Sequence, residues 1–356
     1  MALTTDQVVA ALRTVKDPEL HKDIVTLNMV KNVDVRGSDV DVTVELTTPA
    51  CPLKDVIERD VKAALSGIGA VNVKLNLTAN TRGTPGPNRD ALPQVKNIVA
   101  VGAGKGGVGK STVSVNLAVG LQRAGAKVGL MDGDIYGPSM PTMLGIKGVG
   151  PQVRGNHIIP FHVHGIHAIT IGALVEEDKP LIWRGPMAHG AFKQLLLDNT
   201  EWPELDYLIV DLPPGTGDVP LTLCQLLPLT GAVVVATPQQ VALDDAVRAL
   251  RMFQQLGAPI LGLVENMSYF VGADGSMNDI FGRGGAERAA SRLGIPFLGE
   301  LPMFTELRVN SDAGKPHANF EGPAKLRESL EAITQRLAGE VSRRNLAPAA
   351  PSLNIT

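Results

Sequence analysis

The strongest constraint on the fold is a glycine-rich segment that lies between an apolar run and a helical pattern. Gly104 to Ser111 reads GKGGVGKS and fits the spacing G-x-x-x-x-G-K-[ST]. The run NIVAV before it predicts a buried strand, and STVSVNLAVGLQRAG after it predicts a helix. Backbone N–H groups of such a loop converge on phosphate oxygens at the helix N-terminus. The segment therefore predicts a P-loop in an α/β domain.

The positions of this loop have separate expected roles. Lys110 is expected to reach the β- and γ-phosphates of ATP, and Ser111 is expected to ligate Mg²⁺. A plain glycine-rich turn is the alternative interpretation, and the flanking strand and helix argue against it. The residues expected to bind ATP here are Gly104, Lys105, Gly106, Gly107, Val108, Gly109, Lys110, Ser111 and Thr112.

Acidic residues follow two other apolar runs. Asp211 ends the run YLIVD, which is the usual position of an acid that holds Mg²⁺ through water. Asp132 and Asp134 follow the run ending in GLM. We expect Asp132 to help hold the metal and Asp134 to orient the attacking water. The alternative is that these acids only cap loop ends.

The apolar pattern divides the chain into two parts. Before residue 80, alternating runs around Val40–Thr47 and Val71–Leu77 predict strands, and stripes around Val8–Val15 and Val56–Leu65 predict helices. After residue 95, continuous apolar runs alternate with helical patterns, which is typical of a mostly parallel, doubly wound sheet. The predicted parts are a small α/β domain (1–80), a Pro- and Gly-rich linker (81–95), a P-loop ATPase domain (96–343) and a disordered tail (344–356).

The charge balance bears on the kinds of partner. The chain has 33 Lys and Arg against 36 Asp and Glu, a net charge of -3, so we expect no general attraction to nucleic acid or to an anionic membrane. The N-terminus has no signal-peptide pattern, and two cysteines suit a reducing compartment. A cytoplasmic protein is the expectation.

Lys105 is a second lysine in the loop, and it cannot occupy the place of Lys110. The resulting pattern K-G-G-x-x-G-K-[ST] resembles the dimerising ATPases of the cell-division and plasmid-partition (MinD/ParA) families. In those families the early lysine reaches the partner's nucleotide and acts like an arginine finger. The resemblance implies a homodimer that shares its nucleotides. The alternative is a solvated loop lysine.

Further segments narrow the resemblance to the Mrp (ApbC-like) family of iron–sulfur cluster carrier ATPases, over about residues 96–340. DPELHKDIVTLNMV and TTPACPLKD resemble the small iron–sulfur-assembly-type domain fused to many bacterial members. The segments of the ATPase part are DGDIYGPS (132–139), WRGP (183–186), DLPPGTGD (211–218), ENMS (265–268) and IFG (280–282).

This resemblance implies roles for the matching residues. The chain would bind and hydrolyse ATP with Mg²⁺, and would transfer clusters to apoprotein clients. Asp134 would activate water, and Asp211 would lie in the second metal-binding motif. Pro213–Gly217 would sense the γ-phosphate, and Asn266 would contact adenine, because an amide can donate and accept on a base edge.

The sequence departs from the family at the cluster site. The family's Cys-x-x-Cys pair aligns with Gly272 and Gly275 in the segment VGADGS, which is typical of a surface turn. Glycine has no ligating side chain, and a cluster bridging two chains needs four thiolates. The alternative to a cluster carrier is therefore a cluster-free adaptor or positioning switch of the MinD/ParA type.

Two thiols and a group of histidines complete the candidates. Cys51, before Pro52 at the start of a predicted helix, is either a candidate for cluster handling or a small residue at a helix end. Cys224, in LTLCQLLPL, is predicted to be core. In HIIPFHVHGIH, His162 and His164 are expected to share one face of a strand, which suggests either a metal site or a β-hairpin with solvated imidazoles.

Overall fold

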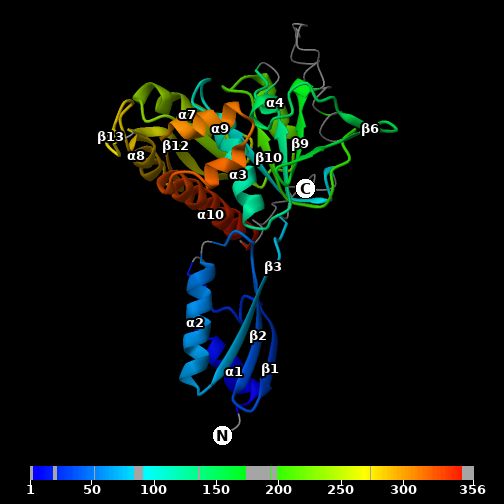
Figure 1. Cartoon of the computed structure of the whole chain (residues 1–356), viewed down its shortest axis with the longest axis vertical. Coiled ribbons are helices and arrows are strands. Elements are labelled where there is room, and N and C mark those ends of the chain that lie inside the picture. Colours follow the sequence, from blue (N-terminus) through cyan, green and yellow to red (C-terminus); the bar gives the residue numbers. More distant parts are fainter. Residues whose placement is uncertain are drawn as a thin grey trace, which may run out of the picture. The chain divides into compact units, whose positions relative to one another are not determined.

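A computed structural model of the 356-residue chain divides into two compact units (Figure 1). One contains residues 1–82 and 342–356, and the other contains residues 83–341. The structure describes residues 3–18, 22–51, 53–83, 91–134, 137–173, 193, 199–272 and 274–346.

The smaller unit packs two helices against a three-stranded sheet. The central strand β2 pairs antiparallel with β1 and parallel with β3. Its alternating sequence buries every second residue, from Val40 to Leu46. The elements are α1 (Thr5–Leu12), β1 (Val30–Arg36), β2 (Asp39–Leu46), α2 (Lys54–Gly67) and β3 (Asn72–Ala79).

Helix α2 contributes one apolar stripe to the core of this unit. Ile57, Val61 and Leu65 are each 0% exposed and lie four residues apart. The sequence prediction began this stripe at Val56, which is only half-buried. Ile57 takes the position because it lies one helical turn before Val61, and Val56 does not.

The larger unit is built on a nine-stranded sheet with strand order β13-β12-β11-β4-β10-β5-β9-β8, and β14 pairs with β12. The pairs among β4, β5, β9, β10, β11, β12 and β14 are parallel, and only the outer pairs β12–β13 and β8–β9 are antiparallel. The strands are β4 (Val95–Gly102), β5 (Val128–Asp132), β8 (Phe161–Val163), β9 (Ile166–Thr170), β10 (Leu205–Asp211), β11 (Gly231–Ala236), β12 (Ile260–Val271), β13 (Met277–Asn278) and β14 (Phe297–Met303).

The remaining elements of this unit lie between its strands or follow the last one. A two-stranded antiparallel sheet of β6 (Gln152–Arg154) and β7 (His157–Ile159) stands apart from the central sheet. The helices are α3 (Lys110–Arg123), α4 (Met140–Met143), α6 (Asp218–Leu226), α7 (Gln240–Gln255), α8 (Gly285–Leu293), α9 (Thr305–Asp312) and α10 (Ala324–Leu346), with 3-10 turns η2 (Ile171–Ala173) and η4 (Pro316–Phe320).

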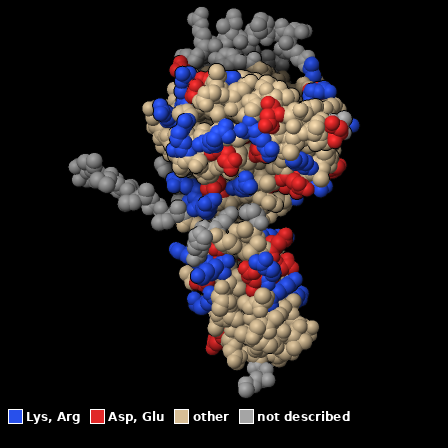
Figure 2. All heavy atoms as spheres, turned by 90° about the vertical axis from the view of Figure 1, so that its left-hand side faces the viewer, with Lys and Arg blue, Asp and Glu red and all other residues tan. Residues whose placement is uncertain are grey.

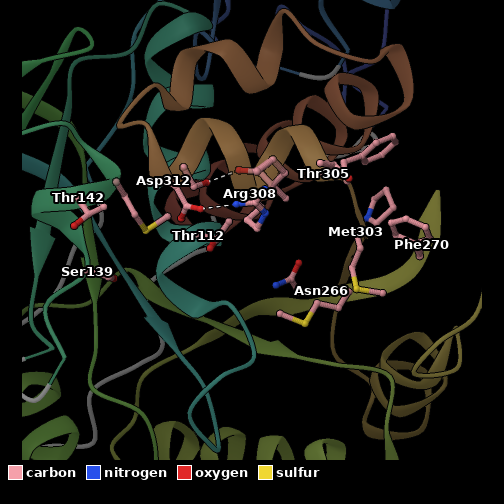
Figure 3. A pocket seen from close by; sticks show the side chains of 15 residues that line it. Thr112, Ser139, Thr142, Asn266, Phe270, Met303, Thr305, Arg308 and Asp312 are labelled. Atoms are coloured by element: carbon pink, nitrogen blue, oxygen red, sulfur yellow. Dashed lines mark hydrogen bonds and ion pairs between the residues drawn. The ribbon is translucent and has the colours of Figure 1, made fainter. Parts of the chain in front are cut away.

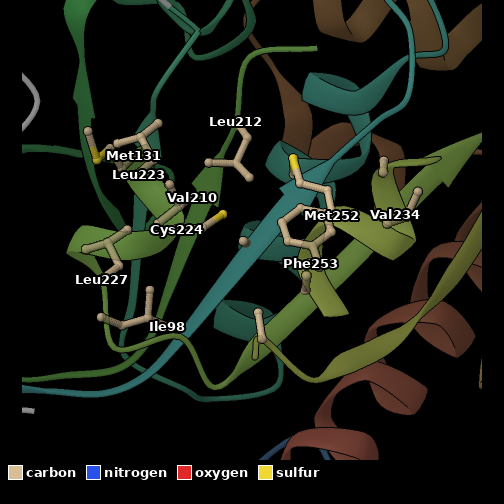
Figure 4. Close-up of a cluster of buried hydrophobic side chains, with 14 of the residues drawn as sticks. Ile98, Met131, Val210, Leu212, Leu223, Cys224, Leu227, Val234, Met252 and Phe253 are labelled. Carbon is tan, nitrogen blue, oxygen red and sulfur yellow. The ribbon is translucent and has the colours of Figure 1, made fainter. Parts of the chain in front are cut away.

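Helices cover both faces of the sheet. On one face, Ile98 of β4 packs with Cys224 of α6 and Phe253 of α7 (Figure 4). The next residue along β4, Val99, is also fully buried but points to the opposite face, which α3 covers. There α3 lies close to α10, because a Cβ atom at Gly120 would lie 2.4 Å from the Thr334 hydroxyl. Burial on both faces explains the continuous apolar strands in the sequence.

The last helix extends further than the sequence pattern suggested. Helix α10 ends at Leu346, so residues 344–346 of the predicted disordered tail are helical, and residues 347–356 lie outside the described part. None of the described helices combines the length and the apolar character that crossing a bilayer requires. On the face in Figure 2, acidic side chains lie among the basic ones on both units, so this face presents mixed charge.

Candidate nucleotide site

The predicted site residues meet at one edge of the central sheet. Strand β4 ends at Gly102, and α3 begins at Lys110 after the glycine-rich loop. The neighbouring parallel strands β5 and β10 end at Asp132 and Asp211, which are direct partners in the ladder. Ligands of open parallel sheets bind outside the carboxyl ends of their strands, so the fold gathers the loop and the acids where a nucleotide is expected.

Two glycines of the loop occupy positions that exclude a side chain. A Cβ atom at Gly104 would lie 2.1 Å from the carbonyl carbon of Asp245 in α7. Gly109 has a left-handed φ of 79°, and its Cβ atom would lie 2.1 Å from the Asn266 Nδ2 atom. Gly109 is the N-cap of α3 and supplies no side-chain cap. The first N–H groups of α3 are therefore suited to an anion.

Lys110 is held by buried acids. Its Nζ atom lies 2.7 Å from Asp211 Oδ2 and 3.7 Å from Asp134 Oδ2. The fully buried Asp211 carboxylate also accepts hydrogen bonds of 2.6 Å from the hydroxyls of Ser111 and Ser114. A buried carboxylate is stable only when its oxygens are paired in this way. The P-loop lysine, the serine and the acid of β10 thus form one connected group.

Asp132 lies beside this group in a different environment. Its carboxylate accepts a 2.8 Å hydrogen bond from the Thr170 hydroxyl and a 3.1 Å bond from the Asp134 N–H. Burial, together with the nearby Asp211 carboxylate, raises the pKa of Asp132 to about 7. Asp132 and Asp211 thus place two buried carboxylates next to one lysine.

This donor set fits Mg²⁺. The cation prefers oxygen ligands, and the Ser111 hydroxyl and the carboxylates of Asp132 and Asp211 are all hard oxygen donors. Two neighbouring buried carboxylates also favour a divalent cation, because it would relieve their mutual repulsion.

Other predicted residues lie around the same loop. Lys105 is half-buried, and its ammonium makes no hydrogen bond or ion pair with any described residue. The segment Pro213–Gly217 contacts the loop, because the Gly215 N–H donates a 2.9 Å bond to the Ala103 carbonyl. The predicted WRGP segment (183–186) lies outside the described residues.

A cavity of about 710 Å³ opens beside the N-terminus of α3 (Figure 3). Thr112 of the loop and Asn266 of β12 both line it. The Asn266 Nδ2 atom donates a 2.8 Å bond to the Val108 carbonyl, which leaves the amide oxygen of Asn266 as an acceptor. Phe270 and Met303 add an apolar wall. The volume and the mixture of apolar walls with a few polar groups suit a nucleoside.

The sequence analysis did not identify most of the residues in one wall of this cavity. It is formed by the loop after β14 and by α9, from Pro302 to Asp312, and includes an Arg308–Asp312 ion pair of 2.8 Å. The only signal in the sequence was that PMFTELR follows an apolar strand, whose carboxyl end lies at the same edge of the sheet.

The two glycines at the expected cluster position lie in a tight turn between β12 and β13. The Gly275 N–H donates a 2.9 Å bond to the Gly272 carbonyl, and the Gly272 N–H donates one of the same length to Ser276. The Asp274 carboxylate accepts a 2.9 Å bond from the Ser276 N–H, and bonding to Ser276 lowers the pKa of Asp274. The described part of this turn offers no thiolate.

The two cysteines have different surroundings. Cys224 is 8% exposed in the core, and burial raises its pKa to about 12, which confirms it as core (Figure 4). Cys51 is half-buried at the rim of the smaller unit's core, three residues before α2 begins at Lys54. Pro52 lies outside the described residues. A role for Cys51 in cluster handling stays a prediction.

A buried glutamate next to Asn266 fixes the strand that carries it. Glu265 is 0% exposed and accepts 2.8 and 2.7 Å bonds from the Gly284 and Ala286 N–H groups at the start of α8. It also accepts a 2.6 Å bond from the Ser268 hydroxyl. The helix dipole favours a carboxylate at this end of α8. Glu265 therefore ties the cavity strand β12 to α8.

Replacing Glu265 with alanine is expected to destabilise the larger unit by about 1–3 kcal/mol, because the Gly284 and Ala286 N–H groups lose their acceptor and Ser268 loses one of two. Hydrogen exchange measured by mass spectrometry should show faster exchange across residues 284–293. Glu287→Ala is the matched control, since Glu287 is in the first turn of α8 but exposed. Equal exchange rates in both variants would contradict the assigned role.

Nearly the full length of the chain matches known protein families and a curated relative. Residues 94–338 match the family described as NUBPL iron-transfer P-loop NTPase, and residues 5–75 match the family described as iron-sulfur cluster assembly protein. An iron-sulfur cluster carrier protein from Synechocystis sp. is 48% identical over 348 residues, which cover 96% of this chain and 98% of that protein.

Solved structures agree with this similarity. A nucleotide-binding protein from Archaeoglobus fulgidus, in complex with ADP, has a TM-score of 0.59 and 36% identity, and the match covers 66% of this chain and 92% of that one. The cell division ATPase MinD from Pyrococcus furiosus has a TM-score of 0.53 and 22% identity, with 67% and 97% covered, which shows the fold alone. The predicted P-loop NTPase fold with a mostly parallel sheet is confirmed.

Proposed function

The chain belongs to the family of NUBPL-type iron-transfer P-loop NTPases, whose curated relatives are named iron-sulfur cluster carrier proteins, and we propose that it hydrolyses ATP to drive transfer of iron–sulfur clusters to apoproteins. The observation that supports the ATPase part most directly is the connected group of Lys110, Ser111 and Asp211 beside the glycine loop. Phosphoryl transfer depends on positioning and charge stabilisation, which such a group supplies.

ATP would bind with its phosphates on the loop and its base in the 710 Å³ cavity. The N–H groups of Gly104–Ser111 and the α3 N-terminus would hold the phosphates, with Lys110 turning from Asp211 toward them. The free amide oxygen of Asn266 would accept a hydrogen bond from the adenine amino group. Mg²⁺, held by Ser111 with Asp211 and Asp132, would supply charge neutralisation on the phosphate oxygens.

Hydrolysis requires an acid that positions the attacking water. Asp134 is the candidate, because its side chain is largely buried at the same edge and lies 3.7 Å from Lys110. Asp132 is less suited to this role, since its oxygens accept bonds from Thr170 and from the Asp134 N–H. The proposed roles of Asp132 and Asp134 are therefore the ones expected from the sequence.

The homodimer is proposed from Lys105. Its ammonium has no partner among the described residues, although it lies in the phosphate loop. In a dimer that closes over two nucleotides, this lysine would stabilise charge on the ATP of the other subunit. ATP binding would close the dimer and hydrolysis would reopen it, provided that cargo or client binds the two states unequally.

The cargo site is the part that departs from the family pattern. The turn at Gly272 and Gly275 supplies no thiolate, so we propose that a cluster is held by Cys51 together with thiols of a donor or client protein. The smaller unit, which carries Cys51, would then also recognise the clients.

Anaerobic reconstitution with iron, sulfide and glutathione tests this proposal. We expect the full chain to bind iron and sulfide with visible absorbance, and Cys51→Ala to lose both, while Cys224→Ala keeps them. The paired variant Gly272→Cys/Gly275→Cys, which restores the family's thiols, is the positive control for the procedure. Absence of a cluster in the original chain alone would contradict the carrier function and favour a cluster-free switch of the MinD/ParA type.

A further inference from the structure

A second cavity of about 570 Å³ lies away from the nucleotide site, beside the hairpin of β8 and β9. His162 of β8 and His167 of β9 both line it. Arg154 and Glu201 line it as well, and they form an ion pair of 3.3 Å with each other. The sequence analysis singled out these histidines, and ATP hydrolysis makes no use of them.

The hairpin geometry brings the two imidazoles together. A two-residue turn of His164 and Gly165, with φ values of 52° and 74°, joins the strands, as in a type I′ turn. The pair next to such a turn, Val163 and Ile166, is hydrogen-bonded, so the following pair of His162 and His167 is a non-hydrogen-bonded one. Side chains of such pairs lie closest, and these two rings have centroids 4.8 Å apart.

This pairing corrects the sequence prediction. His162 and His164 were expected to share a strand face, but β8 ends at Val163 and His164 lies in the turn. The His164 ring is occupied elsewhere, with Nε2 at 3.1 Å from the Leu144 carbonyl and Nδ1 at 3.2 Å from His317 Nδ1.

The ring nitrogens of His162 and His167, in contrast, make no hydrogen bond to any other described residue. Burial, and then the neighbouring His162, lower the pKa of His167 and so favour its neutral form. A neutral imidazole presents a lone pair, and that is the form that binds metal ions.

We propose that His162 and His167 together bind one divalent transition metal ion of the Zn²⁺, Ni²⁺ and Cu²⁺ class, through one nitrogen of each ring. Imidazole favours these ions over Mg²⁺, so the site is chemically distinct from the oxygen ligands of Asp132 and Asp211. Water would complete the coordination, since Arg154 holds the Glu201 carboxylate. The described residues hold no group of three or more metal-binding side chains, so an open, two-ligand site is the expected kind.

Calorimetric titration of the full, untagged chain with Ni²⁺, in excess Mg²⁺ at pH 7.5, tests this site. We expect one Ni²⁺ per chain, and an affinity weakened by about tenfold or more in His162→Ala and in His167→Ala. His157→Ala is the matched control, because His157 is exposed on β7 and does not line the cavity. It should bind Ni²⁺ as the original chain does.

Two results would overturn the proposal. One is unchanged Ni²⁺ affinity in both histidine variants. The other is binding that disappears in Cys51→Ala but persists in the histidine variants, which would assign the metal to the thiol. Unaltered ATP affinity in each variant would verify that the larger unit is still folded, and His162→Asn offers a more conservative substitution at the exposed strand position.

Discussion

Replacing Lys105 with alanine is expected to lower kcat for ATP hydrolysis by about 10³–10⁵-fold, the range found for arginine fingers. The affinity for ATP should change little, because such a residue acts on charge that develops in the transition state. Steady-state phosphate release gives the rate, and equilibrium binding of a fluorescent ATP analogue gives the affinity. Lys110→Ala is the comparison, and it should lose both.

A mixing experiment separates action between subunits from action within one. In a heterodimer of Lys105→Ala and Lys110→Ala chains, the intact Lys105 of the second chain can reach the intact nucleotide site of the first. An equimolar mixture should then recover about a quarter of the original rate, because half of the dimers assort as heterodimers with one intact site each. Each variant alone should be inactive.

The same experiment can contradict the proposal that Lys105 acts on the nucleotide of the other subunit. If heterodimers form, as seen by light scattering with an affinity-tagged partner, and no activity returns, then Lys105 acts on its own subunit. If Lys105→Ala alone hydrolyses ATP at the original rate, the lysine is a solvated loop residue, as the alternative interpretation of the sequence held.

The central sheet and the phosphate loop could be predicted because their signals are local. Strands buried on both faces need nearly continuous apolar runs, and β4, β10 and β11 contain such runs at 98–101, 207–210 and 232–236. Some glycines of the loop are required by contacts with distant segments, which the sequence does not reveal. A side chain at Gly104, for example, would collide with the Asp245 backbone. The motif nevertheless identifies them, because the spacing itself is specific.

The cavity wall and the histidine pair could not be predicted, because both depend on which distant segments meet. Met303 and Arg308 reach the cavity only because β14 pairs with β12. His167 meets His162 because the hairpin turns at His164 and Gly165 rather than continuing as one strand. Residue periodicity fixes the face of an element but not the element opposite it.

The same limit applies to the acids of the DGD segment. The sequence places Asp132 and Asp134 close together at the end of β5, but it does not show that the Thr170 hydroxyl of the adjacent strand β9 donates a hydrogen bond to Asp132. Burial, together with the neighbouring Asp211 carboxylate, then raises the pKa of Asp132. The consequence is a stability effect that the sequence did not suggest.

Without nucleotide or Mg²⁺, the stability of the larger unit is expected to fall as pH rises from about 4 to about 7, and Asp132→Asn should abolish this fall. Asp132 has a folded-state pKa of about 7, against the ordinary aspartate pKa of 3.8, so the folded form retains a proton that the unfolded form releases in this window. The contribution of Asp132 to the free energy of unfolding is fully present below the unfolded-state pKa. It is lost as pH rises through the folded-state pKa, and the total loss is roughly 4 kcal/mol. Urea unfolding in a chelator at pH 5 and pH 8 measures it.

Asp274→Asn is the control of opposite sign. Its pKa is lowered by bonding to Ser276, so its charged form stabilises the fold and its removal should cost stability at pH 8. Asp132→Asn should instead stabilise the apo protein at pH 8, because it removes a buried charge beside Asp211. Equal pH dependence in Asp132→Asn and the original chain would contradict the argument.

Adding Mg²⁺ at pH 8 tests whether the loss of stability caused by the charged Asp132 serves cation binding. A cation held by the Asp132 and Asp211 carboxylates should restore stability to the original chain and restore much less to Asp132→Asn, which keeps only one of the two charges. The unfavourable free energy of two neighbouring buried carboxylates is then the reason that the site binds a cation tightly. Without that difference between the chains, Asp132 would not be a metal ligand, and its burial would have to be explained by its bond to Thr170 alone.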